Sequence, residues 1–246
     1  MSRTILAIPL AALAAAGFAA SPAQADRARH NALDERGTPI PAAWAATGRF
    51  EKLTATGMDD VRLVTGRDWR IRATGDARAL SQLRFLVKDG ALIVGRTSLP
   101  RERYGKVRIE VTAPALRGVT AAGSGMVEVE RIGGGRASAT VAGSGSTTVR
   151  RVDAERLDAT VAGSGELDLT GRSQRVDLTI AGSGRLAGDG FTAGSAHVTV
   201  AGSGGARFRS PGAVRATMVD SGSVEVVGTT DCDQTRMGSG RLTCRR

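Results

Sequence analysis

The sequence predicts an all-β protein, folded as a parallel β-helix: a single-stranded, right-handed β-solenoid with coils of 18 to 20 residues and an irregular N-terminal β cap. Two observations lead to this fold class. A Gly-Ser-Gly phrase recurs through the second half of the chain, and its first residues lie 20, 20, 19, 20, 18 and 18 positions apart. Aromatic residues make up only 3% of the chain, which suits a thin interior of small aliphatic side chains.

The repeated phrase is predicted to be the corner of each coil. Glycine adopts positive φ without steric cost, and small residues allow corners to stack about 4.8 Å apart. The serines are expected to form a stacked ladder that satisfies backbone groups near the turn. The corners are Gly123-Ser124-Gly125, Gly143-Ser144-Gly145, Gly163-Ser164-Gly165, Gly182-Ser183-Gly184, Gly202-Ser203-Gly204, the degraded Asp220-Ser221-Gly222, and Gly238-Ser239-Gly240.

Residues on either side of each corner alternate between apolar and polar, with the period of two that is typical of strands. Positions two, four and six before the corner, and four and six after it, are mostly apolar and are predicted to face the interior. A looser return is expected to complete each coil. The position three before the corner is predicted to point outward, and it is threonine in every copy: Thr120, Thr140, Thr160, Thr179, Thr199, Thr217 and Thr235.

The chain before the repeats is expected to have three parts. Residues 1–25 resemble a secretory signal peptide, with an apolar run followed by Ala23-Gln24-Ala25, so the mature chain would begin at Asp26 and be exported. Residues 26–48 are expected to be a flexible leader. Residues 49–246 would form the solenoid, with 49–118 as its irregular capping part and 119–246 as its regular repeats.

Within the capping part, short alternating runs predict strands at residues 60–65, 69–73, 83–88, 91–96 and 106–112. Asp89-Gly90 predicts a hairpin turn, and residues 76–82 could form a helical turn. At the other end, Cys232 and Cys244 fall in two interior columns of the last coil. They are predicted to form a disulfide that pins the terminal coil, because an exported chain meets oxidising conditions; unpaired buried thiols are the alternative.

The chain resembles the head GIN domain family, described as heads of autotransporter adhesins. The resemblance rests on Phe50-Glu51-Lys52-Leu53, Asp60-Val61-Arg62-Leu63, the stretch from Val87 to Val94, Val107-Arg108-Ile109-Glu110-Val111, and the Ala-Gly-Ser-Gly phrases. It covers residues 49–246 and implies a β-helical exported domain of the bacterial cell envelope. It brings no catalytic residues with it.

The sequence predicts no enzyme, cofactor or metal site. The serines lie in seven equivalent copies, whereas a catalytic serine needs one base. The chain has two histidines: His30 in the leader, and His197 in an outward column with Ser138, Asp158, Asp177, Arg215 and Asp233. Asp153, Glu155 and Asp158 are expected to be neutralised by Arg150, Arg151 and Arg156 rather than to bind calcium. A polysaccharide-cleaving solenoid that uses Asp158, Asp168 and Asp177 is the enzyme alternative.

The net charge of +10 is carried almost wholly by arginine, with lysine at positions 52, 88 and 106 only. A basic exported protein is expected to associate with anionic envelope glycans or lipid surfaces. Specific nucleic-acid binding is disfavoured by location and by the scarcity of stacking aromatics, and no transmembrane segment is expected in the mature chain. Two functions stay open: a binding or adhesion module acting through its outward strand faces, and a structural or envelope-stress element of the periplasm.

Overall fold

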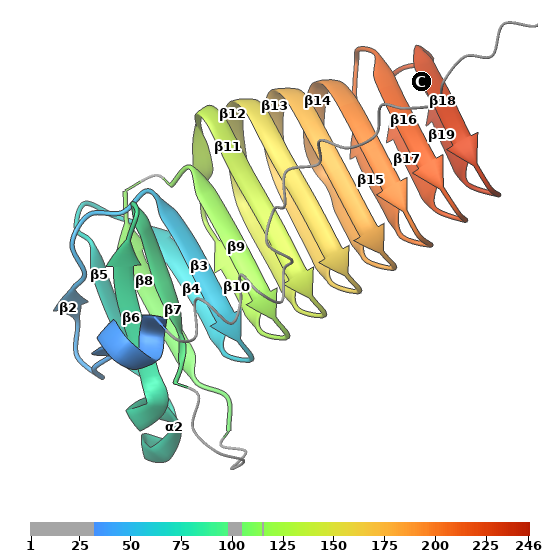
Figure 1. The fold of residues 1–246 in the computed structure, drawn as a ribbon. Coiled ribbons are helices and arrows are strands. Elements are labelled where there is room, and N and C mark those ends of the chain that lie inside the picture. Colours follow the sequence, from blue (N-terminus) through green and yellow to red (C-terminus); the bar gives the residue numbers. More distant parts are fainter. Residues whose placement is uncertain (1–31, 98–104, 115) are drawn as a thin grey trace, which may run out of the picture.

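The computed structural model describes residues 32–97, 105–114 and 116–246. Their strands form one coiled sheet, drawn out into an elongated stack (Figure 1). The predicted signal peptide, its cleavage site and His30 lie outside the described residues. The strands are β1 (Thr38–Pro39), β2 (Ala45–Ala46), β3 (Lys52–Gly57), β4 (Asp60–Thr65), β5 (Arg70–Thr74), β6 (Leu83–Lys88), β7 (Ala91–Arg96), β8 (Arg108–Ala113), β9 (Gly118–Gly123), β10 (Met126–Val129), β11 (Ile132–Gly143), β12 (Ser146–Gly163), β13 (Glu166–Gly182), β14 (Arg185–Ala201), β15 (Gly205–Arg209), β16 (Val214–Val219), β17 (Ser223–Val227), β18 (Cys232–Met237) and β19 (Arg241–Arg245).

The regular part is the predicted parallel β-solenoid. Each coil pairs with the next in parallel, and equivalent residues of the repeat lie side by side: Thr140 is in register with Thr160, and Thr160 with Thr179. The predicted interior columns are buried through most of the stack, as for Val141, Leu157 and Leu169, each 0% exposed. Burial of each such aliphatic side chain contributes roughly 1.5–3 kcal/mol relative to its exposed state. One continuous core therefore runs along the stack.

The returns are more regular than the sequence suggested. β12, β13 and β14 each run from one corner to the next, so the return is part of the sheet. The coil that contains β12 is one residue longer than the coil that contains β13, and the extra residue is absorbed as a register shift between Val149 and Val152. Return residues such as Val152 and Phe191 are buried and complete the interior.

Stacking begins before residue 119, within the stretch expected to be only an irregular cap. β3 pairs in parallel with both β7 and β9, and β4 pairs in parallel with both β8 and β10. The coil formed by β3 and β4 therefore lies between the coil of β7 and β8 and the coil of β9 and β10 (Figure 1). The order of the first coils in space differs from their order in the chain.

Antiparallel strands close the N-terminal end of the stack. β6 pairs with β7 and β5 pairs with β8, so the outer edge of the first coil is covered. The predicted hairpin turn is present, with φ of 51° at Asp89 and 72° at Gly90. The predicted helical turn is α2 (Ala77–Gln82), whose N-cap Asp76 accepts hydrogen bonds from the backbone of Arg78 and Ala79.

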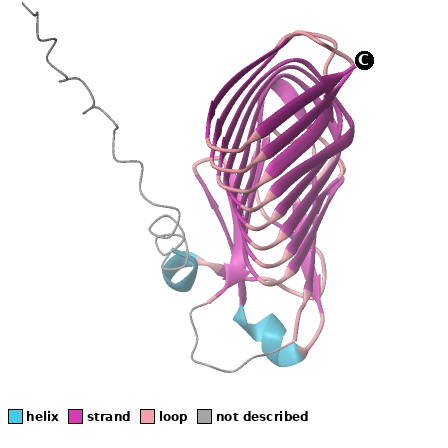
Figure 2. Ribbon diagram, turned by 90° about the vertical axis from the view of Figure 1, so that its right-hand side faces the viewer, coloured by secondary structure: helices cyan, strands magenta, loops and turns pink. Residues whose placement is uncertain are grey.

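Residues 32–48 are not the flexible leader that the sequence suggested. Residues 32–36 are helical, β1 pairs with β6, and β2 pairs with β5. Leu33 and Ile40 are the anchors, at 0% and 4% exposed. Two buried side chains are too few to produce a periodic pattern, so these elements could not be predicted from periodicity. The helices gather at the end of the stack opposite the C-terminus (Figure 2).

The last coil, formed by β18 and β19, is the least buried part of the stack, with every residue of β18 after Cys232 exposed. The predicted disulfide joins Cys232 and Cys244, whose Cα atoms are 6.7 Å apart. Both cysteines pack against the end of the core. The disulfide therefore ties the strand before the last corner to the strand after it.

Candidate functional site

Both glycines of the complete Gly-Ser-Gly corners are required by the stacking of coils, whereas in the degraded corner Asp220 takes the first position with φ of 84°. At Gly143 φ is +118°, and an added Cβ atom would lie 2.4 Å from the carbonyl oxygen of Gly123 in the coil before. At Gly145 an added Cβ atom would lie 2.4 Å from the carbonyl oxygen of Gly125. Real Cβ atoms do not approach an oxygen so closely, so the phrase is fixed by packing between coils.

The serines do not act as the sequence suggested. The backbone N–H groups of Ser144 and Gly145 donate to the carbonyl oxygen of Gly123, at 3.0 and 2.9 Å. The backbone carbonyl of one corner therefore accepts the hydrogen bonds of the N–H groups in the next corner. The serine hydroxyls are not needed for this. The corner serines are exposed, and of these seven described residues only Ser221 forms a hydrogen bond with its hydroxyl, to the carboxylate of Asp220 at 3.1 Å. The serines are spacers whose small size fits the turn.

The threonine column is an outward ladder, as predicted. Thr120, Thr140, Thr160, Thr179, Thr199, Thr217 and Thr235 are in register from coil to coil, and all are half-buried or exposed. Beside them, two residues further along each strand, lies a column of alanines that is interrupted only in the last two coils: Ala122, Ala142, Ala162, Ala181, Ala201, Val219 and Met237. We call these two columns the threonine face. Because its side chains are short in the coils before Val219, this face is flat there; Val219 and the exposed Met237 interrupt it in the last two coils.

The ladder extends one coil further than the sequence indicated. Thr54 in β3 is in register with Thr120, but it is 7% exposed because β7 covers its other side. The sequence pattern missed it because the corner after β3 reads Gly57-Met58-Asp59 rather than Gly-Ser-Gly. The ladder therefore begins in the cap, where it is buried, and the exposed threonine face runs from Thr120 to the last coil.

The same sheet carries a network of arginine and aspartate beside the threonine face. Arg136 donates to Asp158 at 2.6 Å, and Arg156 lies 3.2 Å from Asp158 and 2.8 Å from Asp177. Burial alone would raise the pKa of Asp158, but the hydrogen bonds from Arg136 and Arg156 outweigh it and lower the pKa. Sequence reasoning missed this network because it forms diagonally, between one column and the next.

The sheet on the other side of the corners carries charged residues among its outward side chains. Its ion pairs also connect successive coils, including Arg185 with Glu166 at 2.8 Å and Arg207 with Glu225 at 3.3 Å. Asp168 lies on this sheet and has no cationic partner within the described residues. Its pKa is raised by burial first, and then by the negative charges of Glu166 and Asp189.

This arrangement separates the carboxylates of the enzyme alternative. Asp158 and Asp177 lie in neighbouring coils of one sheet, where both are bound by Arg156, whereas Asp168 lies on the other sheet. The charged return also differs in detail from the prediction: Asp153 pairs with Arg131 and Arg172 from neighbouring coils, not with Arg150 or Arg151. His197 lies in the predicted outward column and is exposed.

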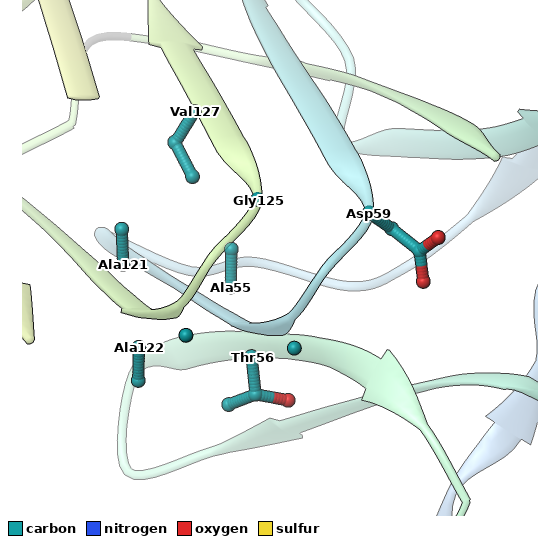
Figure 3. Close-up of a pocket in the computed structure, with 9 residues that line it drawn as sticks. Ala55, Thr56, Asp59, Ala121, Ala122, Gly125 and Val127 are labelled. Atoms are coloured by element: carbon teal, nitrogen blue, oxygen red, sulfur yellow. The ribbon is translucent and has the colours of Figure 1, made fainter. Parts of the chain in front are cut away.

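A small cavity lies under the first corner, between the coil of β3 and β4 and the coil of β9 and β10. Its volume is about 10 Å³, enough for at most one water molecule. Figure 3 shows Ala55, Ala121 and Val127 around it, with the Asp59 carboxylate pointing away from them. This cavity is too small for a ligand. Within the described residues no helix is long and apolar enough to cross a membrane.

The fold and its faces define a class of protein: a one-end-capped parallel β-solenoid whose corners are Gly-Ser-Gly and whose outer surface is a set of in-register ladders. Residues 49–230 match the family described as "Putative auto-transporter adhesin, head GIN domain", and the chain belongs to that family. No relative was found among curated proteins.

Several solved structures share the fold. A putative adhesin from Bacteroides fragilis is similar with a TM-score of 0.75 and 18% identity, over 83% of this chain and 95% of that one. A putative adhesin from Parabacteroides merdae has a TM-score of 0.66 and 18% identity, over 82% and 94%. A protein from Parabacteroides distasonis described as a putative lipid binding protein has a TM-score of 0.68 and 21% identity, over 85% and 98%.

Proposed function

We propose that this protein is an exported, non-catalytic binding module of the bacterial cell envelope, which attaches to an envelope surface through its threonine face. The observation that carries the proposal is the in-register threonine ladder with its flat alanine column. Hydroxyl groups repeat along it at the spacing of the coils, about 4.8 Å. A flat and regular array of hydroxyls and methyls complements an extended glycan or another repetitive surface better than it complements a compact ligand.

Two further features support this assignment. The chain belongs to a family described by an adhesin head domain, which agrees with a surface-binding role. The net charge of +10 favours association with anionic envelope glycans or lipid surfaces, in a manner that added salt would weaken. A purely structural protein would not need to bind anything through its outward columns. Substitutions in these columns therefore distinguish the binding role from the structural one.

The test is retention of the mature protein on purified cell-wall material and on glycan arrays, at low and at physiological salt. A variant with Thr140, Thr160, Thr179 and Thr199 changed to lysine should lose retention, because long charged side chains break the flat face. A second variant with the same four residues changed to valine keeps the strand propensity and removes the hydroxyls.

The matched control places four lysines on the opposite sheet, at Thr148, Thr170, Ser223 and Thr243, which also point outward. It adds the same charge without changing the threonine face, so it should be retained at least as well as the native protein. Circular dichroism and thermal melting must show that each variant is folded. If the native protein is not retained on any envelope material, or if the two lysine variants behave alike, the threonine face is not a binding surface.

A further inference from the structure

The network of arginine and aspartate ion pairs does not continue past the coil that contains Arg175. Arg136 pairs with Asp158, 22 residues on and one coil further along the stack, and Arg156 pairs in the same way with Asp177. The corresponding partner of Arg175 would be residue 197, which is His197. Among the described residues no ion pair or hydrogen bond involves the Arg175 guanidinium. The series of arginine and aspartate pairs therefore ends with a positive charge that has no partner.

A pocket lies at this break. Its volume is about 360 Å³, and it is lined by side chains of three successive coils, including Arg175, Asp177, Ser195, His197 and Arg215. The pocket exists because the arginine column that contains Arg136, Arg156 and Arg175 continues with the small residues Ser195 and Ala213. Arginine side chains occupy this column in the earlier coils. Ser195 and Ala213 are too short to do so, and the surface is hollow beside them.

The charges around the pocket favour an anion. The one carboxylate in its lining, Asp177, forms an ion pair with Arg156 at 2.8 Å, although the buried Oδ2 atom of Asp177 accepts no hydrogen bond. Arg215 has a single partner, Asp233 at 3.7 Å, and both side chains are more than three-quarters exposed, so this pair is weak. The lining therefore includes two arginines, a serine and a histidine, and its one carboxylate is paired with an arginine.

We propose that this pocket binds a phosphate group. Arginine forks are suited to phosphate oxygens, and a tetrahedral oxyanion can accept hydrogen bonds from Arg175 on one coil, Ser195 on the next and Arg215 on the third. The proposal deepens the proposed function and rests on it for the source of the ligand, since His197 lies two residues before Thr199, next to the threonine face. A lipid headgroup and a free or polymer-borne phosphate share this chemistry.

His197 supplies a local readout, because the chain has only one other histidine, His30. In a background with His30→Gln, imidazole signals in nuclear magnetic resonance report on His197 alone. Titration with inorganic phosphate at constant pH and ionic strength should give a saturable shift. Arg175→Gln should weaken phosphate binding by about tenfold or more, because a hydrogen bond to a charged group is lost. Ser195→Arg, which refills the column, should abolish it.

The matched control is Arg151→Gln, which removes one exposed positive charge in a neighbouring return that does not line the pocket. It should leave the phosphate titration unchanged. The absence of a saturable shift in the native protein, or equal weakening by Arg175→Gln and Arg151→Gln, would overturn the site. Each variant is checked for folding by its thermal transition.

Vesicles separate the two sources of phosphate. Binding to vesicles that contain phosphatidic acid, but not to vesicles of equal charge that contain phosphatidylserine, with loss in Arg175→Gln, identifies a lipid headgroup. Saturable phosphate binding without vesicle binding identifies a free or polymer-borne phosphate. If phosphate binds but no envelope material retains the protein, the site stands and the proposed function fails. If envelope material retains the protein while phosphate gives no shift at His197, the function stands and the site fails.

Discussion

Arg96 at the end of β7 donates two hydrogen bonds to the buried carboxylate of Asp59, from Nε at 2.7 Å and from Nη2 at 2.6 Å. The hydrogen bond with Asp59 raises the pKa of Arg96 against the opposing effect of burial. Asp59 also accepts from the backbone N–H of Val107 at 3.1 Å. Asp59 stands where the second glycine of later corners stands. Asp59 therefore links the corner after β3 to the end of β7 and to the residue directly before β8. These two points lie on either side of the connection between β7 and β8.

We expect Asp59→Ala to destabilise the protein by about 3 kcal/mol, because it leaves the Arg96 guanidinium without its partner in a nearly buried site. The control is Asp189→Ala, which removes an ion pair with Arg207 at a side chain that is 74% exposed. The control should change the free energy of unfolding by less than about 1 kcal/mol. Denaturant unfolding measures both. Equal effects would show that the Asp59 and Arg96 pair does not hold the first coils together.

The corners give a second prediction. Gly143→Ala should cost about 2 kcal/mol or more, because it combines a positive φ with a contact of 2.4 Å to the carbonyl oxygen of Gly123. Ser144→Ala, at the adjacent exposed position, should change stability by less than about 0.5 kcal/mol. Thermal unfolding of the two variants decides the point. A large effect of Ser144→Ala would mean that the serine hydroxyls do support the turn.

A third prediction concerns Thr147, which occupies an interior column and is 1% exposed. Its hydroxyl oxygen has no hydrogen-bond partner, and its register neighbours are Val127 and Leu167 in the adjoining coils. Thr147→Val should stabilise the protein by about 1 kcal/mol, because it replaces a buried unsatisfied hydroxyl by a methyl group. Thr148→Val, on the outward side of the same strand, is the control and should have little effect. A loss of stability in Thr147→Val would contradict the packing described for this column.

The regular coils were predictable because each column repeats one type of residue in register. Thr140, Thr160 and Thr179 show this: a shift of register by one residue would move every threonine inward and every valine outward. The threonine face was therefore found from the sequence. The break at His197 was not, because it is visible only when the arginine column is compared with the aspartate column of the following coil.

The first coils were not predictable from periodicity. The corner at Gly57-Met58-Asp59 lacks the repeated phrase, and the next corner in the chain, at Gly123, is 66 residues later. Nothing in the local pattern indicates that β3 pairs with β7 on one side and β9 on the other. That order is fixed by tertiary contacts such as the one between Asp59 and Arg96, which involve residues 37 positions apart.

The disulfide gives a fourth prediction. Replacement of both Cys232 and Cys244 by alanine should lower the free energy of unfolding by about 3 kcal/mol, as expected from the entropy of closing a loop of this length. The effect should be concentrated in β18 and β19, whose residues are the most exposed of the stack. Hydrogen exchange should therefore accelerate in these strands and stay unchanged in β12 and β13. Faster exchange throughout the stack would show that the last coil is not an independent unit.

Asp168 and Asp158, which lie on the two different outward sheets, should respond to acid in opposite ways. The pKa of Asp168 is raised in the folded state, so its ionised form is unfavourable there. As the pH falls through this raised value, the folded state gains a proton before the unfolded state does, and the cost is relieved. Asp168→Asn should therefore be more stable than the native protein at pH 7, by less than about 1 kcal/mol, with the difference vanishing below the ordinary aspartate pKa of about 4.

Asp158 should show the reverse sign, because its folded-state pKa is lowered by Arg136 and Arg156. Its contribution to stability is present above the ordinary aspartate pKa and is lost as the pH falls through the lowered folded-state value. Asp158→Asn should thus be less stable than the native protein at pH 7 and approach it only in strong acid. Denaturant unfolding at pH 7, 5 and 3 measures both variants. If the two substitutions shift stability in the same direction at pH 7, the two sheets do not differ in their electrostatics, and the arginine network does not distinguish the sheet that carries the threonine face.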